Sequence, residues 1–218
     1  MPRALFEKTG NARYISHLDL MRLFQRAFKR AGLPLTHTQG FNPRPSVSIA
    51  LPLSLGVESR CELLDFDLEI PVDCGEIRER LNASLVEGVF VREVYERGEK
   101  IKNLALLKSR LVLEYDRQIP NDITQQLQNL FSQTELIVEK KGKNGSTQQD
   151  IIPMVRRLEV DRISDREVEM IALHCCQNPA LNPMQLSAAI GKYLPALSPD
   201  YVRCIRQEIF DANERIFR

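Results

Sequence analysis

The chain has 218 residues, of which 43% are hydrophobic, and its formal net charge is +1. That length and apolar content suit one large or two small folded domains and exclude a disordered chain. It has no run of about 18 apolar residues, and its N-terminus, MPRALFEKTG, lacks a signal-peptide core, so we expect a cytoplasmic protein without a membrane span.

Charge is distributed unevenly along the chain. Residues 1–50 hold eight Lys and Arg against two acidic residues, a net of +6. Because the whole chain carries +1, the remainder carries −5. Such asymmetry predicts an anionic partner for the basic segment.

The cysteines give no sign of a disulfide framework or a metal site. The odd number of them, five, and their spacing favour reduced thiols. His174, Cys175 and Cys176 are adjacent, but neighbours on a strand point to opposite faces and cannot converge on one ion. We therefore expect neither a metal nor another cofactor.

The first half of the chain predicts strands and helices in the order β-α-β-β-α-β. Ser16 is the expected N-cap of the first helix, with Asp19 in capping-box position, and Gly32 ends that helix. This element order is that of the ferredoxin-like unit. The expected elements are strand 3–8, the helix between residues 16 and 32, strands 47–53 and 61–70, a helix around 75–85, and strand 90–95.

The second half predicts the same order after a polar linker at residues 98–103. Residues 148–165 do not match any element of this order, and we interpret them as a short helix or an insertion. We therefore predict an α+β protein of two tandem ferredoxin-like sandwiches, residues 1–98 and 104–218. The expected elements here are strand 110–115, helix 123–131, strand 136–139, a mobile loop at 140–147, strand 167–174, helix 184–193 and strand 202–210.

The first predicted helix has a cationic polar side. Helical spacing places four cations in one stripe opposite the apolar face. No acidic residue follows Asp19 until Glu58, so the stripe lacks a local partner and an external polyanion would stabilise it. The four cations are Arg22, Arg26, Lys29 and Arg30.

The loop after this helix continues the basic segment. Gly40 permits a positive φ, while Pro43 and Pro45 hold the residues before them extended. An aromatic, an amide and an Arg on a stiff loop suit one stacked base and one phosphate. In the competing interpretation, the aromatic ring fills the core and the cations are merely solvated. With the helix, the candidate nucleic-acid-binding residues are Arg13, Arg22, Arg26, Lys29, Arg30, His37, Phe41, Asn42 and Arg44.

Several motifs resemble the radical-SAM-linked domain family, a family of unknown function. They are YISHLDL from Tyr14, the Arg26-Ala27 and Arg30-Ala31 pairs, GFNPRP from Gly40, and the acidic ELLDFD from Glu62. Members of that family occur alone or fused C-terminally to cobalamin-binding radical SAM proteins. Their genes often lie beside those of ribonuclease G and ribosomal proteins. The resemblance thus implies a radical SAM partner and an RNA-related role.

Two positions depart from the family pattern. Ser46 stands where members commonly carry Lys, and Ile152 stands where an Arg is expected. If those cations contact the ligand, this chain binds it differently or more weakly.

The chain is not expected to be the radical enzyme itself. It lacks the C-x3-C-x2-C cluster motif, a P-loop and a dinucleotide fingerprint. His17 with Tyr14 could act as a base toward an RNA 2′-hydroxyl, with His37 as the acid. The simpler interpretation is that His17 helps to fix the start of the helix. The carboxylates of Asp65, Asp67 and Glu69 favour a solvated sheet face over a metal site.

The favoured function is a non-catalytic module that binds transfer or ribosomal RNA and docks a cobalamin-binding radical SAM enzyme. The first alternative is a metal-independent endoribonuclease that uses Tyr14, His17 and His37. The second is a protein-binding subunit whose basic helix meets an acidic patch on that enzyme.

Overall fold

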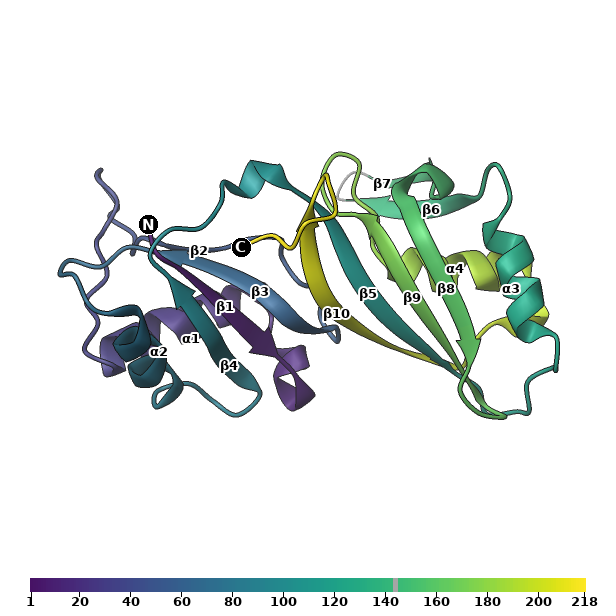
Figure 1. The fold of residues 1–218 in the computed structure, drawn as a ribbon, viewed down its shortest axis with the longest axis horizontal. Helices are drawn as coiled ribbons and strands as arrows, with labels where there is room; N and C mark the ends of the chain where they lie inside the picture. Colours follow the sequence, from purple (N-terminus) through teal and green to yellow (C-terminus); the bar gives the residue numbers. More distant parts are fainter. Residues whose placement is uncertain (143–144) are drawn as a thin grey trace. The chain divides into compact units, whose positions relative to one another are not determined.

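The computed structural model describes residues 1–142 and 145–218, which divide into two compact units, each of strands and helices (Figure 1). The protein is therefore an α+β protein. Unit 1 comprises Met1–Asn103 with Phe217–Arg218, and unit 2 comprises Leu104–Ile216. The sequence assigned the last two residues to the second domain. They belong to unit 1, where Phe217 is fully buried with its ring 5.6 Å from the Arg3 guanidinium.

Unit 1 is an antiparallel sheet with two helices. Its strands lie in the order β4-β1-β3-β2. Two short 3-10 turns, Gly10–Tyr14 and Ile101–Asn103, complete the unit. Its elements in chain order are β1 (Arg3–Lys8), α1 (His17–Arg30), β2 (Val47–Ile49), β3 (Glu58–Phe66), α2 (Cys74–Asn82) and β4 (Val89–Tyr95).

Both helices of unit 1 contribute to one apolar core. Phe6 of β1 meets Phe24 of α1 edge to face, with ring centroids 4.8 Å apart. Ile77 and Leu81 of α2 complete the same cluster. Because the apolar side of α1 is committed to this core, its cationic side faces outward.

The predicted ends of α1 are confirmed. The Ser16 hydroxyl accepts a hydrogen bond from the Asp19 backbone N–H at 3.2 Å, as an N-cap does. At the other end Gly32 adopts φ +63°, which costs a residue without a Cβ little. Arg80 of α2 donates to the carbonyls of Ala31 and Gly32, both at 2.9 Å, and so fixes the chain as it leaves the helix.

The predicted strand 61–70 is wrong at both ends. The strand runs Glu58–Phe66, and beyond it only Leu68 keeps an isolated bridge, to Leu35. Ile70, the last residue of the predicted strand, is 54% exposed. The acidic residues do not share one role, since Asp65 pairs with Arg3 and Asp67 accepts from Thr36.

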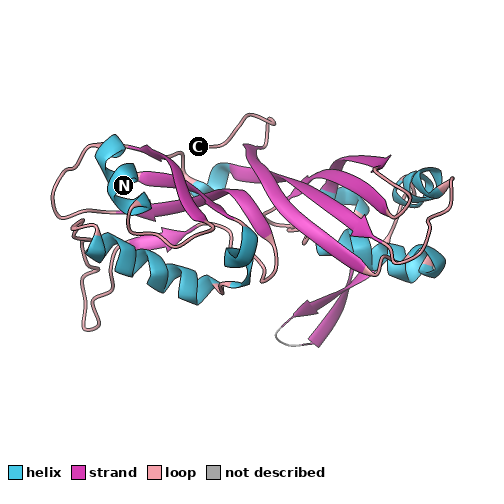
Figure 2. Ribbon diagram, turned by 90° about the horizontal axis from the view of Figure 1, so that it is seen from below, coloured by secondary structure: helices cyan, strands magenta, loops and turns pink. Residues whose placement is uncertain are grey.

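Unit 2 is a second antiparallel sheet with two helices. Its strands lie in the order β10-β5-β9-β8. A separate two-stranded sheet, β6-β7, stands apart from these strands in Figure 2. The elements are β5 (Leu104–Glu114), α3 (Ile123–Phe131), β6 (Ile137–Gly142), β7 (Gly145–Asp150), β8 (Val155–Arg162), β9 (Glu167–Cys175), α4 (Met184–Tyr193) and β10 (Tyr201–Asp211).

Two predictions for unit 2 are wrong. The strand expected at 136–139 is present as β6, but the loop expected at 140–147 instead extends β6 and begins β7, with Lys140 paired to Thr147; residues 143–144 lie outside the described residues. The edge strand of the main sheet is instead β8, inside the stretch that fitted no element. A register shift between Val155 and Arg157 breaks the alternation by which a strand is recognised.

The cysteines are free thiols, as expected. Burial raises the pKa of Cys176 and of Cys204 to about 12, so both stay protonated at neutral pH. The described residues include no cluster of His, Cys, Asp and Glu that could hold a metal ion. Every helix within residues 1–142 and 145–218 falls short of the length and apolarity that a bilayer crossing requires.

Candidate nucleic-acid interface

Three arginines of α1 line one groove, which we call the arginine groove. Arg22, Arg26 and Arg30 project from successive turns, and the cavity between them and the segment before β4 measures about 300 Å³. The groove is completed by Ile15, Asp19, Leu23 and Val86. A row of guanidinium groups with an apolar wall is suited to a chain of phosphates.

The arginine groove contains one carboxylate, at its N-terminal end. Arg22 pairs with Asp19 at 3.0 Å, but both side chains are largely exposed, so solvent weakens this pair. Hydrogen bonds from Ser16 and then from Arg22 lower the pKa of Asp19. Arg30 donates to the Ser84 carbonyl at 2.6 Å and keeps its charge. Arg26 has no hydrogen bond or ion pair within the described residues.

Other cations of the N-terminal segment serve the fold. Arg3 is buried and pairs with Asp65 at 2.6 Å. Lys8 is also buried, and its ammonium donates to the Arg13 and Ile15 carbonyls, which positions the start of α1. Arg13, a predicted binding residue, pairs with Glu58 at 3.1 Å. The charge available to a ligand is therefore concentrated on α1 and the following loop.

The loop between α1 and β2 is braced at its base. The Thr38 N–H donates to the Arg44 carbonyl at 2.8 Å, and the Arg44 N–H donates back to the Thr38 hydroxyl at 3.0 Å. His37 also forms a bridge to Pro45. Gly40, at the tip, takes φ +138°, as the sequence anticipated. The stiffness expected of this loop thus rests on hydrogen bonds as well as on its prolines.

Phe41 lies at the tip of the braced loop and is 100% exposed. The interpretation that this ring fills the core is wrong. Asn42 and Arg44 are exposed beside it. Leaving so large an apolar ring in water forgoes its transfer free energy, and a stacking partner would restore it.

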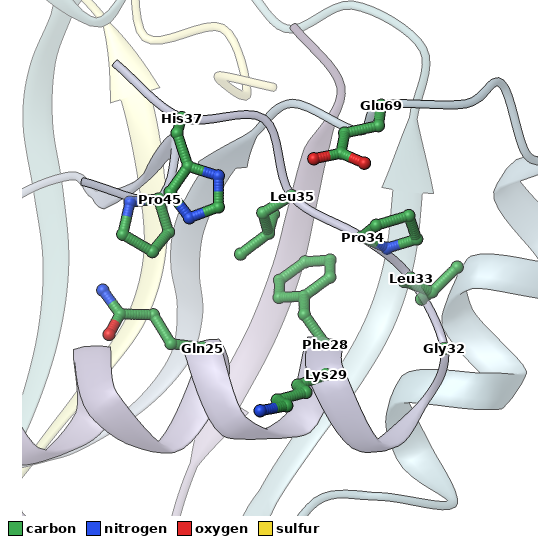
Figure 3. Close-up of a pocket in the computed structure, with 10 residues that line it drawn as sticks. All are labelled: Gln25, Phe28, Lys29, Gly32, Leu33, Pro34, Leu35, His37, Pro45 and Glu69. Atoms are coloured by element: carbon green, nitrogen blue, oxygen red, sulfur yellow. The ribbon is translucent and has the colours of Figure 1, made fainter. Parts of the chain in front are cut away.

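A second cavity, of about 460 Å³, lies between α1 and the loop; we call it the loop pocket (Figure 3). Lys29 lines this pocket and not the arginine groove, so the predicted single stripe of four cations is divided. His37 lines the loop pocket as well. Gln25 and Glu69, which the sequence did not single out for this role, face the same space.

The histidines proposed as an acid–base pair do not meet. His17 is the first residue of α1, and Gln25, which lines the loop pocket with His37, lies about 12 Å further along the helix axis. Tyr14 is exposed beside the Arg13 guanidinium, whose carbon lies 5.2 Å from the ring centroid. Neither Tyr14 nor His17 lines any of the described pockets.

Two of the residues that complete these cavities had no signal in the sequence for that role. Glu69 belonged to an apparent alternation of apolar and acidic residues, which assigned it to a strand instead of to a pocket wall. Val86 lies between α2 and β4, where no local pattern marks a binding residue. Both positions depend on tertiary packing around α1.

The fold of this chain is similar to that of a solved structure with which it shares 10% sequence identity. A chain of a crystallised Cbf5-Nop10-Gar1 complex superimposes with a TM-score of 0.53 over 95% of this chain and 48% of its own length. This chain thus spans about half of that one. A protein from Galdieria sulphuraria (10% identity, 94% and 96% coverage) and a putative glycine cleavage system transcriptional repressor (14%, 94% and 96%) give TM-scores of 0.27 and 0.24, too low to support an argument.

No curated protein matches the chain. The model of a bacterial family does match, over residues 2–183, which include all of α1, the braced loop and the walls of both cavities. The chain therefore belongs to the family described as "Uncharacterized protein conserved in bacteria (DUF2344)".

Proposed function

We propose that unit 1 binds single-stranded RNA, with the phosphates in the arginine groove and a base on Phe41. The observation that carries the proposal is the combination of Arg26, an outward guanidinium without a carboxylate partner in the described residues, with a fully exposed aromatic ring on a braced loop. Single-strand binding combines a cationic track with stacking platforms, because every base has a π-face.

The wider setting is also part of the proposal. Each unit would be a ferredoxin-like sandwich, which their strand orders, β4-β1-β3-β2 and β10-β5-β9-β8, support. The motifs around Tyr14 and Gly40 support association with a cobalamin-binding radical SAM enzyme, to which the module would present transfer or ribosomal RNA in the cytoplasm. The two separated histidines, His17 and His37, favour binding over RNA cleavage.

A salt titration tests the RNA proposal. Anisotropy of a labelled oligouridine RNA of about 12 nucleotides would be followed between about 50 and 200 mM salt. Three neutralised phosphates predict a log–log slope of about −2, or an affinity loss of roughly twentyfold over that range. The Arg22→Ala/Arg26→Ala/Arg30→Ala variant should lose most of this slope.

The control removes the same charge from elsewhere in unit 1. Arg60, Arg78 and Arg97 are exposed and lie outside the groove, so their triple Ala variant should keep most of the slope. Equal losses in both variants, or binding that is indifferent to salt, would refute the proposal. Capture of the radical SAM enzyme after nuclease treatment, with no RNA affinity, would favour the protein-binding alternative.

A further inference from the structure

The loop pocket has an apolar floor and polar walls. Phe28, Leu33 and Leu35 are buried beneath it, and Pro34 and Pro45 lie at its edges. Its volume of about 460 Å³ is typical of sites for small planar ligands. Such a floor suits the face of a nucleobase, leaving the polar walls to read its edges.

Two opposite charges face the loop pocket without pairing. Lys29 lines the pocket from α1, with its side chain lying along the helix, whereas the Glu69 carboxylate points into the pocket from the segment after β3 (Figure 3). Within the described residues neither group has a hydrogen-bond or ion-pair partner. The Glu69 backbone is held by its N–H bond to the Pro34 carbonyl at 2.9 Å. The pocket therefore offers a two-oxygen acceptor from one segment and a flexible cationic donor at its edge on α1.

We propose that the loop pocket recognises guanine, an inference that rests on the RNA-binding function proposed above. Guanine presents two adjacent donors, N1–H and the N2 amino group, which both oxygens of the Glu69 carboxylate would accept together. It presents two acceptors, O6 and N7, on its other edge, where a Lys is a common partner. Lys29 provides that donor.

The other bases match the hydrogen-bonding groups of Glu69 and Lys29 less well than guanine does. Adenine and cytosine each offer a single amino group beside an acceptor nitrogen, which would repel one Glu69 oxygen. Uracil offers one N–H between two carbonyls. Gln25 and His37 also line the pocket, but each can donate or accept, so neither selects a base by itself.

One RNA strand can occupy the loop pocket and the arginine groove together. Gln25, Phe28 and Lys29 are interleaved on α1 with Arg22, Arg26 and Arg30. At 3.6 residues per turn, the two groups centre about 100° apart around the helix. The pocket and the groove thus occupy adjoining sides of one helix, with Lys29 directly before Arg30. A base in the pocket would have its own phosphate directed to the groove.

Competition between matched RNAs tests the guanine proposal. The probes are oligouridine of about 12 nucleotides and the same strand with one central guanosine, inosine or adenosine. The guanosine strand should bind roughly tenfold more tightly than the adenosine strand. Inosine lacks the N2 amino group and should lose most of that gain.

Glu69→Gln is the decisive variant, since it should bind the guanosine and inosine strands equally. Glu79→Gln, an equal charge change on the exposed face of α2, is the control and should keep the preference. Salt-dependent oligouridine binding without a guanosine preference would overturn the guanine proposal and leave RNA binding in place. A preference that survives Glu69→Gln would overturn it too, and no binding of any probe would overturn both proposals.

Discussion

Both units pair arginines with carboxylates, but two arginines of the arginine groove differ from these. In unit 1 the pairs are Arg3–Asp65, Arg13–Glu58, Arg22–Asp19, Arg80–Glu76 and Arg92–Glu7. Five arginines of unit 2 contact carboxylates, in the pairs Arg110–Glu169, Arg117–Asp200, Arg157–Glu214, Arg162–Asp165 and Arg203 with both Glu114 and Glu167. On α1 of unit 1, Arg26 and Arg30 have no carboxylate partner within the described residues. A count of formal charge cannot separate paired from unpaired arginines, because only the fold decides which of them lie beside a carboxylate.

The histidines show the same contrast. His174 of unit 2 is fully buried, and its Nδ1 lies 3.2 Å from the Cys175 carbonyl, which can only accept. Nδ1 therefore carries the proton, and Nε2 accepts from the Ser109 hydroxyl at 2.9 Å. His37 of unit 1 is exposed at the loop pocket. The His174 ring is thus satisfied within unit 2, whereas the His37 ring of unit 1 is available to a ligand.

The largest effect that we predict is an acid-induced loss of unit 2 stability. Burial lowers the pKa of His174 from 6.5 to about 4, so the unfolded chain binds a proton at a higher pH than the folded one. Stability contributed by the neutral ring is complete above pH 6.5 and is lost as the pH falls toward 4. The full loss is about 3 kcal/mol, measurable by urea unfolding followed by circular dichroism.

Ser109→Ala tests the hydrogen bond to the neutral His174 ring, because it removes the hydroxyl donor and keeps the ring buried. It should destabilise unit 2 by about 1–2 kcal/mol at neutral pH. An unfolding free energy that stays constant from about pH 7 to about pH 5 would contradict a neutral buried His174.

The next effect concerns the ring at the loop tip. Phe41→Ala should weaken oligouridine binding roughly tenfold, since base stacking is worth about 1–3 kcal/mol. The unfolding free energy should change by less than about 0.5 kcal/mol, because the ring contributes nothing to the core. Phe90→Ala removes another exposed ring of unit 1, on β4, and should leave binding intact. Equal losses in the two variants would show that stacking at the tip is not specific.

The sequence predicted much of this fold because local signals agreed with packing. Helices 123–131 and 184–193 were predicted with the bounds that are observed, and Ser16 was identified as a cap. Strand β8 was missed because its bulge breaks the two-residue period. The end of β3 was misjudged because apolar and acidic residues continue to alternate past Phe66, where the chain turns to form the loop pocket.

The candidate site was predictable only in part. Helical spacing alone grouped Arg22, Arg26 and Arg30, because that grouping is a property of one element. The pairing of Arg13 with Glu58, by contrast, spans residues far apart in the chain. The position of Glu69 opposite Lys29 likewise depends on β3 ending beside α1. Contacts between elements carry no signal in local periodicity.

A smaller effect separates the two uses of arginine directly. Arg203→Ala leaves the Glu114 and Glu167 carboxylates without their shared cation and should cost about 1 kcal/mol, a modest value because the side chain is half exposed. Arg26→Ala should change stability by less than about 0.5 kcal/mol. RNA affinity should show the reverse: Arg26→Ala should weaken RNA binding, and Arg203→Ala should leave it unchanged. Urea unfolding and anisotropy on both variants measure this, and a parallel response would contradict the contrast.

The smallest predicted effect has the opposite sign. Asp19→Asn removes the one carboxylate of the arginine groove and releases Arg22, so RNA should bind about two- to threefold more tightly at low salt, with the gain fading as salt rises. The same change removes a negative charge from the N-terminus of α1 and should lower the stability slightly. Glu93→Gln makes the same charge change at an exposed position of β4, outside the groove, and should produce neither result. Tighter binding by a less stable protein would show that Asp19 stabilises the helix at the expense of the groove, whereas unchanged or weaker binding would remove Arg22 from the interface.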